Sequence, residues 1–528
     1  MKWASIAVAA AAVTFFAVRI YDTQRGPGLA VWHTYIPHEM HAAELDAADW
    51  NQYLAREAQI FDDVRREVTD KIEPADRVAV NRYYADSPVY PEHFAQDFNR
   101  SFVLEPKGPP TGAVVLLHGL TDSPYSQRHI AEIYRAHGFV AIVIRLPGHG
   151  TVPAGLIDAN WQDWMAATRL AVREARRRVG PDAPLHLVGF SNGGALAVKY
   201  ALDAIDDPNL SRPDRLVLIS PMIGITRFAR YAGLAALPAK LPAFAKAAWL
   251  GVLPEFNPFK YNSFPVNGAV QSFELTQVLQ REIAENGRNG RLERLPPIIT
   301  FQSVMDFTVS TPAIVTALYS HLPPNGSELV LFDVNRTAKY GALLRPSAET
   351  ALSRLLPRGA HNYRTTVITN ADVPDGSETE RVVAPGETAE HDRPLGMSYP
   401  AGLYSLSHVA LPFPINDSLY GLTPEGMDFG IHLGSIAPRG ERNVLIASLD
   451  ALLRASSNPF FPYMKARIDD TIDHPHAAAV AATDAKASPD ANSSSAPYEN
   501  IPDWSLRGTI AQIMRFVRGE PEPLPEEP

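Results

Sequence analysis

The chain has 528 residues, a formal net charge of −10 and no cysteine. This length predicts one large domain with insertions, or two domains. An acidic chain has no surplus of Lys and Arg to replace phosphate counterions, so the charge argues against a nucleic-acid partner. Without cysteine the chain has no disulfides, thiolate catalysis or cysteine-ligated metal, and we expect neither a cofactor nor a metal.

Residues 3–18 form an uncharged run between Lys2 and Arg19. Such a run is typical of an export signal or a membrane anchor, although a bilayer span needs about 20 residues. Small residues suited to signal cleavage occur only inside the alanine run, which favours an uncleaved anchor within residues 1–22. We expect a membrane-anchored or exported protein, with a bacterial-type inner membrane or periplasm favoured.

Residues 23–105 are predicted to form a helical extension. Between 41 and 72 apolar residues recur at the three-to-four spacing of a helix with one buried face. These residues are Leu45, Trp50, Tyr53, Leu54, Phe61, Val64, Val68 and Ile72.

Six short apolar runs follow, most of them separated by helical patterns. They lie at 113–119, 139–146, 185–190, 215–220, 297–303 and 327–334. Continuous apolar strands that alternate with helices indicate a mostly parallel sheet with helices on both faces, which is an α/β fold.

Two long intervals interrupt the domain predicted at 106–474. Residues 222–295 are too many for a simple crossover and are predicted to form a helical cap over the carboxyl ends of the strands. Residues 336–400 are a second insertion, with two strands expected around the Asp-Gly turn at 375–376. Residues 475–500 are predicted to be a flexible linker, and 501–528 a helix followed by an acidic, Pro-rich tail.

The run at 185–190 leads directly into Gly-Phe-Ser-Asn-Gly, a Gly-x-Ser-x-Gly pattern, and then into an Ala/Leu/Val-rich helical segment. A serine on a tight strand-to-helix turn presents its hydroxyl above the sheet, and the two glycines give the backbone room to turn. Ser191 is therefore the candidate nucleophile.

A serine nucleophile needs a base, a group that orients the base, and donors for an oxyanion. In this topology the acid and the histidine follow the serine in that order along the chain. Asp306, just beyond the strand at 297–303, fits the acid; the alternative is that it caps the helix beginning near Thr311.

The order rule leaves seven histidines as possible bases: His321, His361, His391, His408, His432, His474 and His476. His408 is the best candidate because it follows the apolar segment 402–406, as a loop histidine at the end of a buried strand does. His361 is the alternative, although no strand is expected before it.

The oxyanion donors are expected to be two main-chain N–H groups. One belongs to Asn192, directly after the nucleophile, and the other to Leu120, in the loop after the strand at 113–119. His149, in the Pro-Gly-His-Gly turn, is expected to pack that loop rather than to act as a ligand or catalyst.

Three motifs occur in family order: LLHGLTDSPYS, RLPGHGTVPAGL and LVGFSNGG. With them the chain resembles the α/β-hydrolase superfamily over residues 106–335, in particular monoglyceride lipases, carboxylesterases and serine aminopeptidases. The resemblance implies that Ser191 is the nucleophile, Asp306 the acid, His408 the base, and Leu120 and Asn192 the oxyanion donors. One departure is the interval of about 100 residues between Asp306 and His408, where relatives have a few tens.

These features predict a serine hydrolase that cleaves a carboxylic ester through an acyl-enzyme, on a small-molecule or lipid substrate. The apolar residues of the cap, which would shape an acyl-chain pocket, favour acyl or lipid esters; they are Phe228, Leu234, Leu237, Leu241, Phe244 and Trp249. Two alternatives remain open. The same triad serves peptidases and acyltransferases, and a hydrolase scaffold can also carry a non-catalytic binding protein.

Overall fold

The computed structural model describes residues 27–225, 236–306, 308–337, 350–371, 377–400, 403, 405–434 and 457–474, with six isolated positions between 3 and 21. Most of the predicted anchor, the linker and the C-terminal helix lie outside the described residues. Within them, no helix has the length and apolar character needed to cross a membrane.

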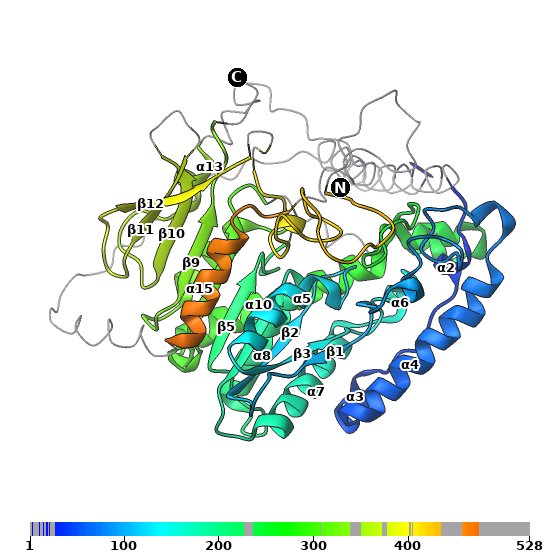
Figure 1. Ribbon diagram of the computed structural model, residues 1–528, viewed down its shortest axis with the longest axis horizontal. Helices are drawn as coiled ribbons and strands as arrows, with labels where there is room; N and C mark the ends of the chain where they lie inside the picture. The colour runs from blue at the N-terminus through cyan, green and yellow to red at the C-terminus, as the bar shows by residue number, and fades with distance from the viewer. Residues whose placement is uncertain are drawn as a thin grey trace.

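Ten strands of the described residues form one sheet, in the order β1-β3-β2-β4-β5-β8-β9-β10-β11-β12 (Figure 1). They are β1 (Phe102–Leu104), β2 (Gly112–Leu117), β3 (Phe139–Ile144), β4 (Leu185–Phe190), β5 (Arg215–Ile219), β8 (Ile298–Ser303), β9 (Glu328–Phe332), β10 (Arg364–Asn370), β11 (Ser377–Val383) and β12 (His391–Ser398). The strands from β3 to β10 are parallel, and β1, β11 and β12 are antiparallel to their neighbours. The six predicted runs are six of these strands, which confirms the predicted architecture.

Helices cover both faces of the sheet because its strands are apolar on both sides. One face packs on α7 (Trp161–Val179), α8 (Asn192–Asp206) and α10 (Val266–Arg288), and the other on α5 (Arg128–Ala136) and α15 (Phe461–Asp473). The order of strands reverses at β2, since β3 lies on one side of it and β4 on the other. Ligands of open α/β sheets bind at the carboxyl ends of the strands beside such a reversal.

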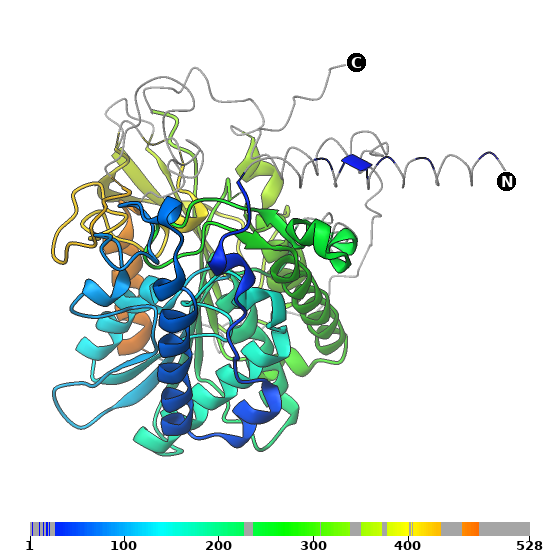
Figure 2. The ribbon, with the colours of Figure 1, turned by 90° about the vertical axis from the view of Figure 1, so that its right-hand side faces the viewer.

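The N-terminal extension is helical in its first part, as predicted, whereas β1 of the sheet lies at its end, inside the range predicted at 23–105. It contains α2 (Val31–Thr34), α3 (Ala42–Ala47) and α4 (Trp50–Glu67), and α4 begins at an Asp49 cap whose carboxylate accepts the N–H of Gln52. Figures 1 and 2 place α4 along one side of the domain, at the end of the sheet opposite β12. Leu45, Trp50 and Tyr53 are buried in the same apolar cluster as the sheet.

The interval expected as a cap has two parts. Its second part is α10, which packs on α8 and therefore belongs to the core as the crossover helix between β5 and β8. The described first part has two 3₁₀ segments, Leu237–Lys240 and Pro242–Ala248, and the small hairpin β6 (Trp249–Gly251) and β7 (Phe264–Pro265). Residues 226–235, with Phe228 and Leu234, lie outside the described residues.

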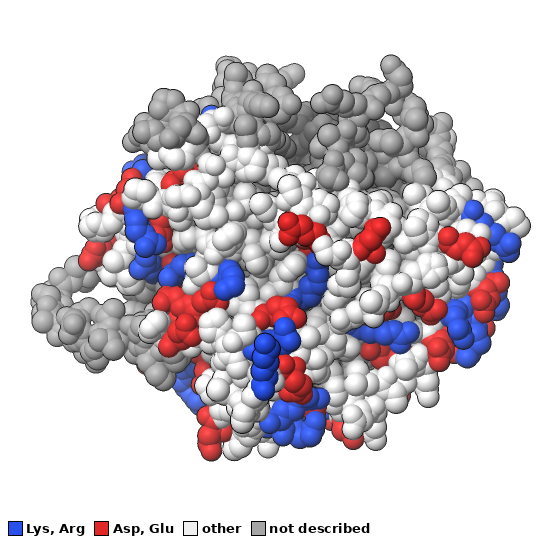
Figure 3. Space-filling model, in the orientation of Figure 1, with Lys and Arg blue, Asp and Glu red and all other residues white. Residues whose placement is uncertain are grey.

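The two strands expected in the second insertion are β10 and β11, which pair antiparallel. They form no separate unit, because β10 continues the central sheet in parallel with β9. Short helices accompany the sheet elsewhere, namely α6 (Gly155–Asp158), α11 (Thr311–Ala313) and α13 (Ala351–Leu355). On the face seen in Figure 3, acidic and basic side chains are interspersed.

Candidate active site

Ser191 lies on the turn between β4 and α8. Its backbone angles are φ 53° and ψ −114°, a strained conformation for a residue other than glycine. Two hydrogen bonds hold it: the Ser191 N–H donates to the Ile219 carbonyl at 3.0 Å, and the Met222 N–H donates to the Ser191 carbonyl at 2.9 Å. The structure therefore contains the predicted elbow.

The glycines of the elbow allow backbones to approach closely. A Cβ on Gly193 would lie 2.1 Å from the carbonyl oxygen of Leu117, and one on Gly189 would lie 2.4 Å from that of Gly193. Since real Cβ atoms do not approach oxygen so closely, only glycine lets α8 begin beside the end of β2.

The two predicted oxyanion donors flank the serine. Asn192 is the first residue of α8, and the first N–H groups of a helix have no partner within it. On the other side, a Cβ on Gly119 would lie 3.2 Å from the Cβ of Ser191, so the Gly119–Leu120 peptide is next to the serine. His149 packs against His118 of this loop, with ring centroids 5.0 Å apart, as expected.

Asp306 and His408 are brought together although they lie 102 positions apart in the chain. The Nδ1 of His408 and the Oδ2 of Asp306 are 2.8 Å apart, a hydrogen-bond distance. The imidazole stacks on Phe190, the residue before Ser191, with ring centroids 5.2 Å apart and planes 29° from parallel. The pair thus lies beside the elbow.

Asp306 is ionised and held by several donors. Its Oδ1 accepts the N–H groups of Thr308 and Val309 at 2.8 and 3.0 Å, and its Oδ2 accepts the amide of Gln302 at 3.1 Å. Burial alone would raise the pKa of this carboxyl, but the charge and hydrogen bond of His408 and the two N–H groups outweigh burial and lower it. The alternative role of helix cap falls to Ser310, which accepts the N–H of Ala313.

The expectation that His408 follows a buried strand at 402–406 is wrong. The described residues of that segment have no strand, and His408 instead begins a 3₁₀ turn, His408–Ala410. Two buried side chains hold the loop: the Ser303 hydroxyl donates to the Leu406 carbonyl at 2.8 Å, and the Asn335 amide donates to the Leu403 carbonyl at 2.7 Å. His361 lies before β10, where its ring stacks on Tyr363.

Gln302 and Ser303 are site residues that the sequence reading missed. Both are fully buried at the carboxyl end of β8, where they hold Asp306 and the His408 loop. The available signal was two polar residues at the end of an apolar strand, four and three positions before the candidate acid. Among the described residues, no group of three or more His, Asp or Glu is placed to hold a metal ion.

Part of the chain is similar to known proteins. Residues 108–258 match the family model described as serine aminopeptidase, S33. The thermostable monoacylglycerol lipase of Bacillus sp. (strain H-257) is 32% identical over 88 residues, which are 17% of this chain and 34% of that enzyme. The chain thus spans about a third of the length of this curated relative.

Two solved structures are also similar. One comes from a study of two metagenome-derived lipolytic enzymes, LipS and LipT (22% identity, 49% of this chain and 97% of that chain, TM-score 0.35). The other is a soluble variant of monoglyceride lipase from Saccharomyces cerevisiae with a substrate analogue (16% identity, 44% and 81%, TM-score 0.34). Both TM-scores are low, so neither likeness bears on the activity.

Proposed function

This chain belongs to the α/β-hydrolase superfamily, and from that premise we propose that it is a serine hydrolase that cleaves a carboxylic ester. Ser191 is the nucleophile, His408 the general base and Asp306 the group that orients the base. The observation that carries the proposal is the 2.8 Å contact between His408 and Asp306 beside the strained Ser191. A hydrolase scaffold that had lost its activity would have no chemical reason to keep Ser191, His408 and Asp306 together.

The proposed reaction uses these three side chains in turn. With Nδ1–H donated to Asp306, the Nε2 of His408 takes the proton of Ser191 as its oxygen attacks the ester carbonyl carbon. The N–H groups of Leu120 and Asn192 bind the oxyanion, and His408 then protonates the departing alcohol. Water attacks the acyl-enzyme as His408 takes its proton. His408 then returns that proton to the Ser191 oxygen as the bond between this oxygen and the acyl carbon breaks, and the carboxylic acid leaves.

A lipid or acyl ester is the proposed substrate. The monoacylglycerol lipase relative supports this class, and so do Leu237 and Leu241 of the cap, which are 41% and 58% exposed. Trp249, expected among the pocket residues, is buried instead and packs edge-on against His33 of the extension at 4.9 Å. The acyl chain therefore has to be bound by other cap residues.

The test is reaction with a fluorophosphonate probe followed by mapping of the modified peptide, with Ser191→Ala as the matched variant. We expect labelled Ser191 in the wild type, and a loss of ester hydrolysis of about 10⁴-fold or more in folded Ser191→Ala. Undiminished turnover in that variant would remove the proposal, and unlabelled Ser191 in folded protein would indicate a binding protein.

Aminoacyl amides and added alcohols separate the remaining activities. The matching family model is described as serine aminopeptidase, so aminoacyl p-nitroanilides are assayed beside p-nitrophenyl esters of increasing chain length. Turnover of the amides alone would replace the esterase by a peptidase, and transfer of the acyl group to an alcohol in preference to water would indicate an acyltransferase.

The cellular location is a proposal from sequence alone. The uncharged run at 3–18 supports a membrane-anchored or exported protein. Recovery of the full chain in the soluble cytoplasmic fraction after cell fractionation would contradict it.

A further inference from the structure

The turn at 145–151 lies between the N-terminal extension and the oxyanion loop. It begins with Arg145, whose fully buried guanidinium is held by two carboxylates of the extension. Glu39 binds it with both oxygens, at 2.7 and 2.9 Å, and Glu57 binds its Nε at 3.1 Å. Its Nη1, one of the two nitrogens that bind Glu39, also donates to the His149 carbonyl of the turn itself, at 2.9 Å.

The partners of Arg145 are themselves fixed. Glu57 accepts the hydroxyl of Ser101 at 2.8 Å, and the Tyr53 hydroxyl donates to the Arg145 carbonyl at 2.5 Å. Burial alone would lower the pKa of the guanidinium, but Glu39, Tyr53 and Glu57 outweigh burial and raise it. Arg145 is thus a buried cation held by two carboxylates, and removal of Glu39 leaves Glu57 as the remaining carboxylate partner of its guanidinium.

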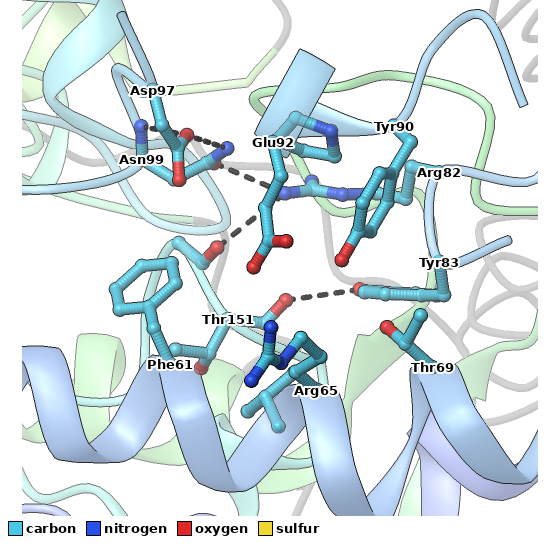
Figure 4. Close-up of a pocket in the computed structure, with 13 residues that line it drawn as sticks. Phe61, Arg65, Thr69, Arg82, Tyr83, Tyr90, Glu92, Asp97, Asn99 and Thr151 are labelled. Atoms are coloured by element: carbon cyan, nitrogen blue, oxygen red, sulfur yellow. Dashed lines mark hydrogen bonds between the residues drawn. The ribbon is translucent and has the colours of Figure 1, made fainter. Parts of the chain in front are cut away.

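The other end of the turn is also held by the extension (Figure 4). The Arg82 guanidinium donates to the Gly150 carbonyl at 3.4 Å, and the Tyr83 hydroxyl donates to the Thr151 carbonyl at 3.1 Å. The approach is close, since a Cβ on Gly150 would lie 2.4 Å from the carbonyl oxygen of Asn99. The turn therefore cannot shift outward without moving the extension.

The inner side of the turn contacts the oxyanion loop through His118. The Leu146 N–H donates to His118 Nε2 at 3.0 Å, so the imidazole proton is on Nδ1 and is donated to the Gly119 carbonyl, 2.9 Å away. Burial, with the nearby His149, lowers the pKa of His118 and keeps the ring neutral, as this pair of bonds requires. Gly119 is the residue whose Cα faces the Ser191 Cβ.

We propose that the N-terminal extension holds the Gly119–Leu120 peptide in place to bind the oxyanion, with Glu39 and Arg145 as positioning residues that act through the turn and His118. This inference rests on the proposed function, since it assigns the extension a role in that reaction. Because the oxyanion forms only when the serine attacks and is absent from the bound ester, a displaced donor lowers kcat and leaves substrate binding unchanged.

The test compares Glu39→Gln with Asp46→Asn in the full chain. Glu39→Gln keeps the shape of the side chain and removes its charge. Asp46 is the control because it binds Arg169 with both oxygens, at 2.8 and 2.6 Å, on the exposed side of the same extension. We expect Glu39→Gln to lower kcat about tenfold or more, since loss of one oxyanion donor costs 10²–10³-fold. KM is expected to stay within about twofold, and Asp46→Asn to leave both constants unchanged.

A trifluoromethyl ketone gives the second readout. It forms a tetrahedral oxyanion on the serine, so its inhibition constant is expected to rise by the factor by which kcat falls, which a loss of folded protein does not produce. Unchanged kcat in folded Glu39→Gln would overturn the inference, and so would a kcat loss without a change in ketone affinity. If Glu39→Gln does not fold, Tyr83→Phe is used instead, because it removes only the donor to the Thr151 carbonyl. The test is again whether kcat falls and the inhibition constant of the ketone rises by the same factor.

The experiments separate a failure of the proposed serine hydrolase activity from a failure of the role assigned to the extension. A wild-type chain that neither hydrolyses esters nor reacts with the fluorophosphonate at Ser191 would refute the proposed function. An active wild type with an unaffected Glu39→Gln would refute the inference alone.

Discussion

The two halves of the site are held in different ways. The Ser191 half is built from regular elements: β4 and α8 are consecutive in the chain, β2 pairs with β4, and glycines set their spacing. The His408 half lies on an irregular loop beyond β12, which side chains such as Ser303 and Asn335 hold by donating to its carbonyls. Local geometry positions Ser191, whereas hydrogen bonds between distant segments position His408.

The largest expected effect comes from removing the base. His408→Ala is expected to lower kcat for ester hydrolysis by about 10⁴-fold, because Ser191 loses its proton acceptor. His361→Ala is the control, since its ring stacks on Tyr363 before β10 and is expected to leave kcat unchanged. Steady-state kinetics with a p-nitrophenyl ester measures both, and the reverse result would transfer the base to His361.

A methyl group added at Gly193 is expected to disturb the Ser191 half of the site. Gly193→Ala is expected to destabilise the fold by about 3 kcal/mol, because the new Cβ meets the backbone of β2, which has nowhere to move. Helix propensity alone predicts the opposite sign, about 1 kcal/mol of stabilisation. Urea unfolding decides between them, with Gly108→Ala as the control because a Cβ there contacts nothing within 4 Å. A stable, fully active Gly193→Ala would contradict the role of close packing.

A smaller effect is expected at Ser303, whose hydroxyl holds the His408 loop. Ser303→Ala leaves the Leu406 carbonyl without its donor, at a cost of about 1–2 kcal/mol. If that displaces His408, kcat falls up to about tenfold, by the equivalence of 1.4 kcal/mol and a factor of ten. Ser353→Ala removes a comparable hydrogen bond to Thr350 on an exposed helix and is expected to change nothing. Equal kcat values in the two variants would show that the loop does not depend on Ser303.

The smallest effect on activity is expected at Glu378, on β11. Burial, with Asp333 nearby, raises the pKa of this carboxyl to about 8, so it is protonated in the folded chain at neutral pH. A raised folded pKa contributes stability that is complete below the unfolded value near 4.5 and is lost as pH rises toward 8. Glu378→Gln is therefore expected to flatten this part of the stability profile, measured by urea unfolding between pH 5 and 9. A variant that follows the wild-type slope would contradict the assignment.

Local sequence patterns predicted most strands of the sheet and the Ser191 half of the site. Six strands of the sheet are short apolar runs, most of them separated by periodic helices, so local composition was enough to predict β2, β3, β4, β5, β8 and β9. Ser191 could be predicted from its neighbours, since the strand, the turn and the helix of the elbow are adjacent in the chain. Asp306 could be placed because it follows a strand directly. His408 was chosen by the order rule, but the residues that the structure describes at 402–406 form no strand before it.

The remaining features depend on contacts between distant segments. No local pattern indicates that β10 joins the central sheet beside β9, or that α10 belongs to the core, because each is decided by which apolar surface it covers. The partners of Arg145 lie 106 and 88 positions away, and no spacing in the sequence links them. The sequence by itself indicated the elbow at Ser191, six strands of the sheet and the place of Asp306 after one of them, because adjacent residues specify these features. The tertiary structure alone decided how the base and the extension meet that elbow, because buried charges and carbonyls are satisfied only by partners that folding brings within hydrogen-bond distance.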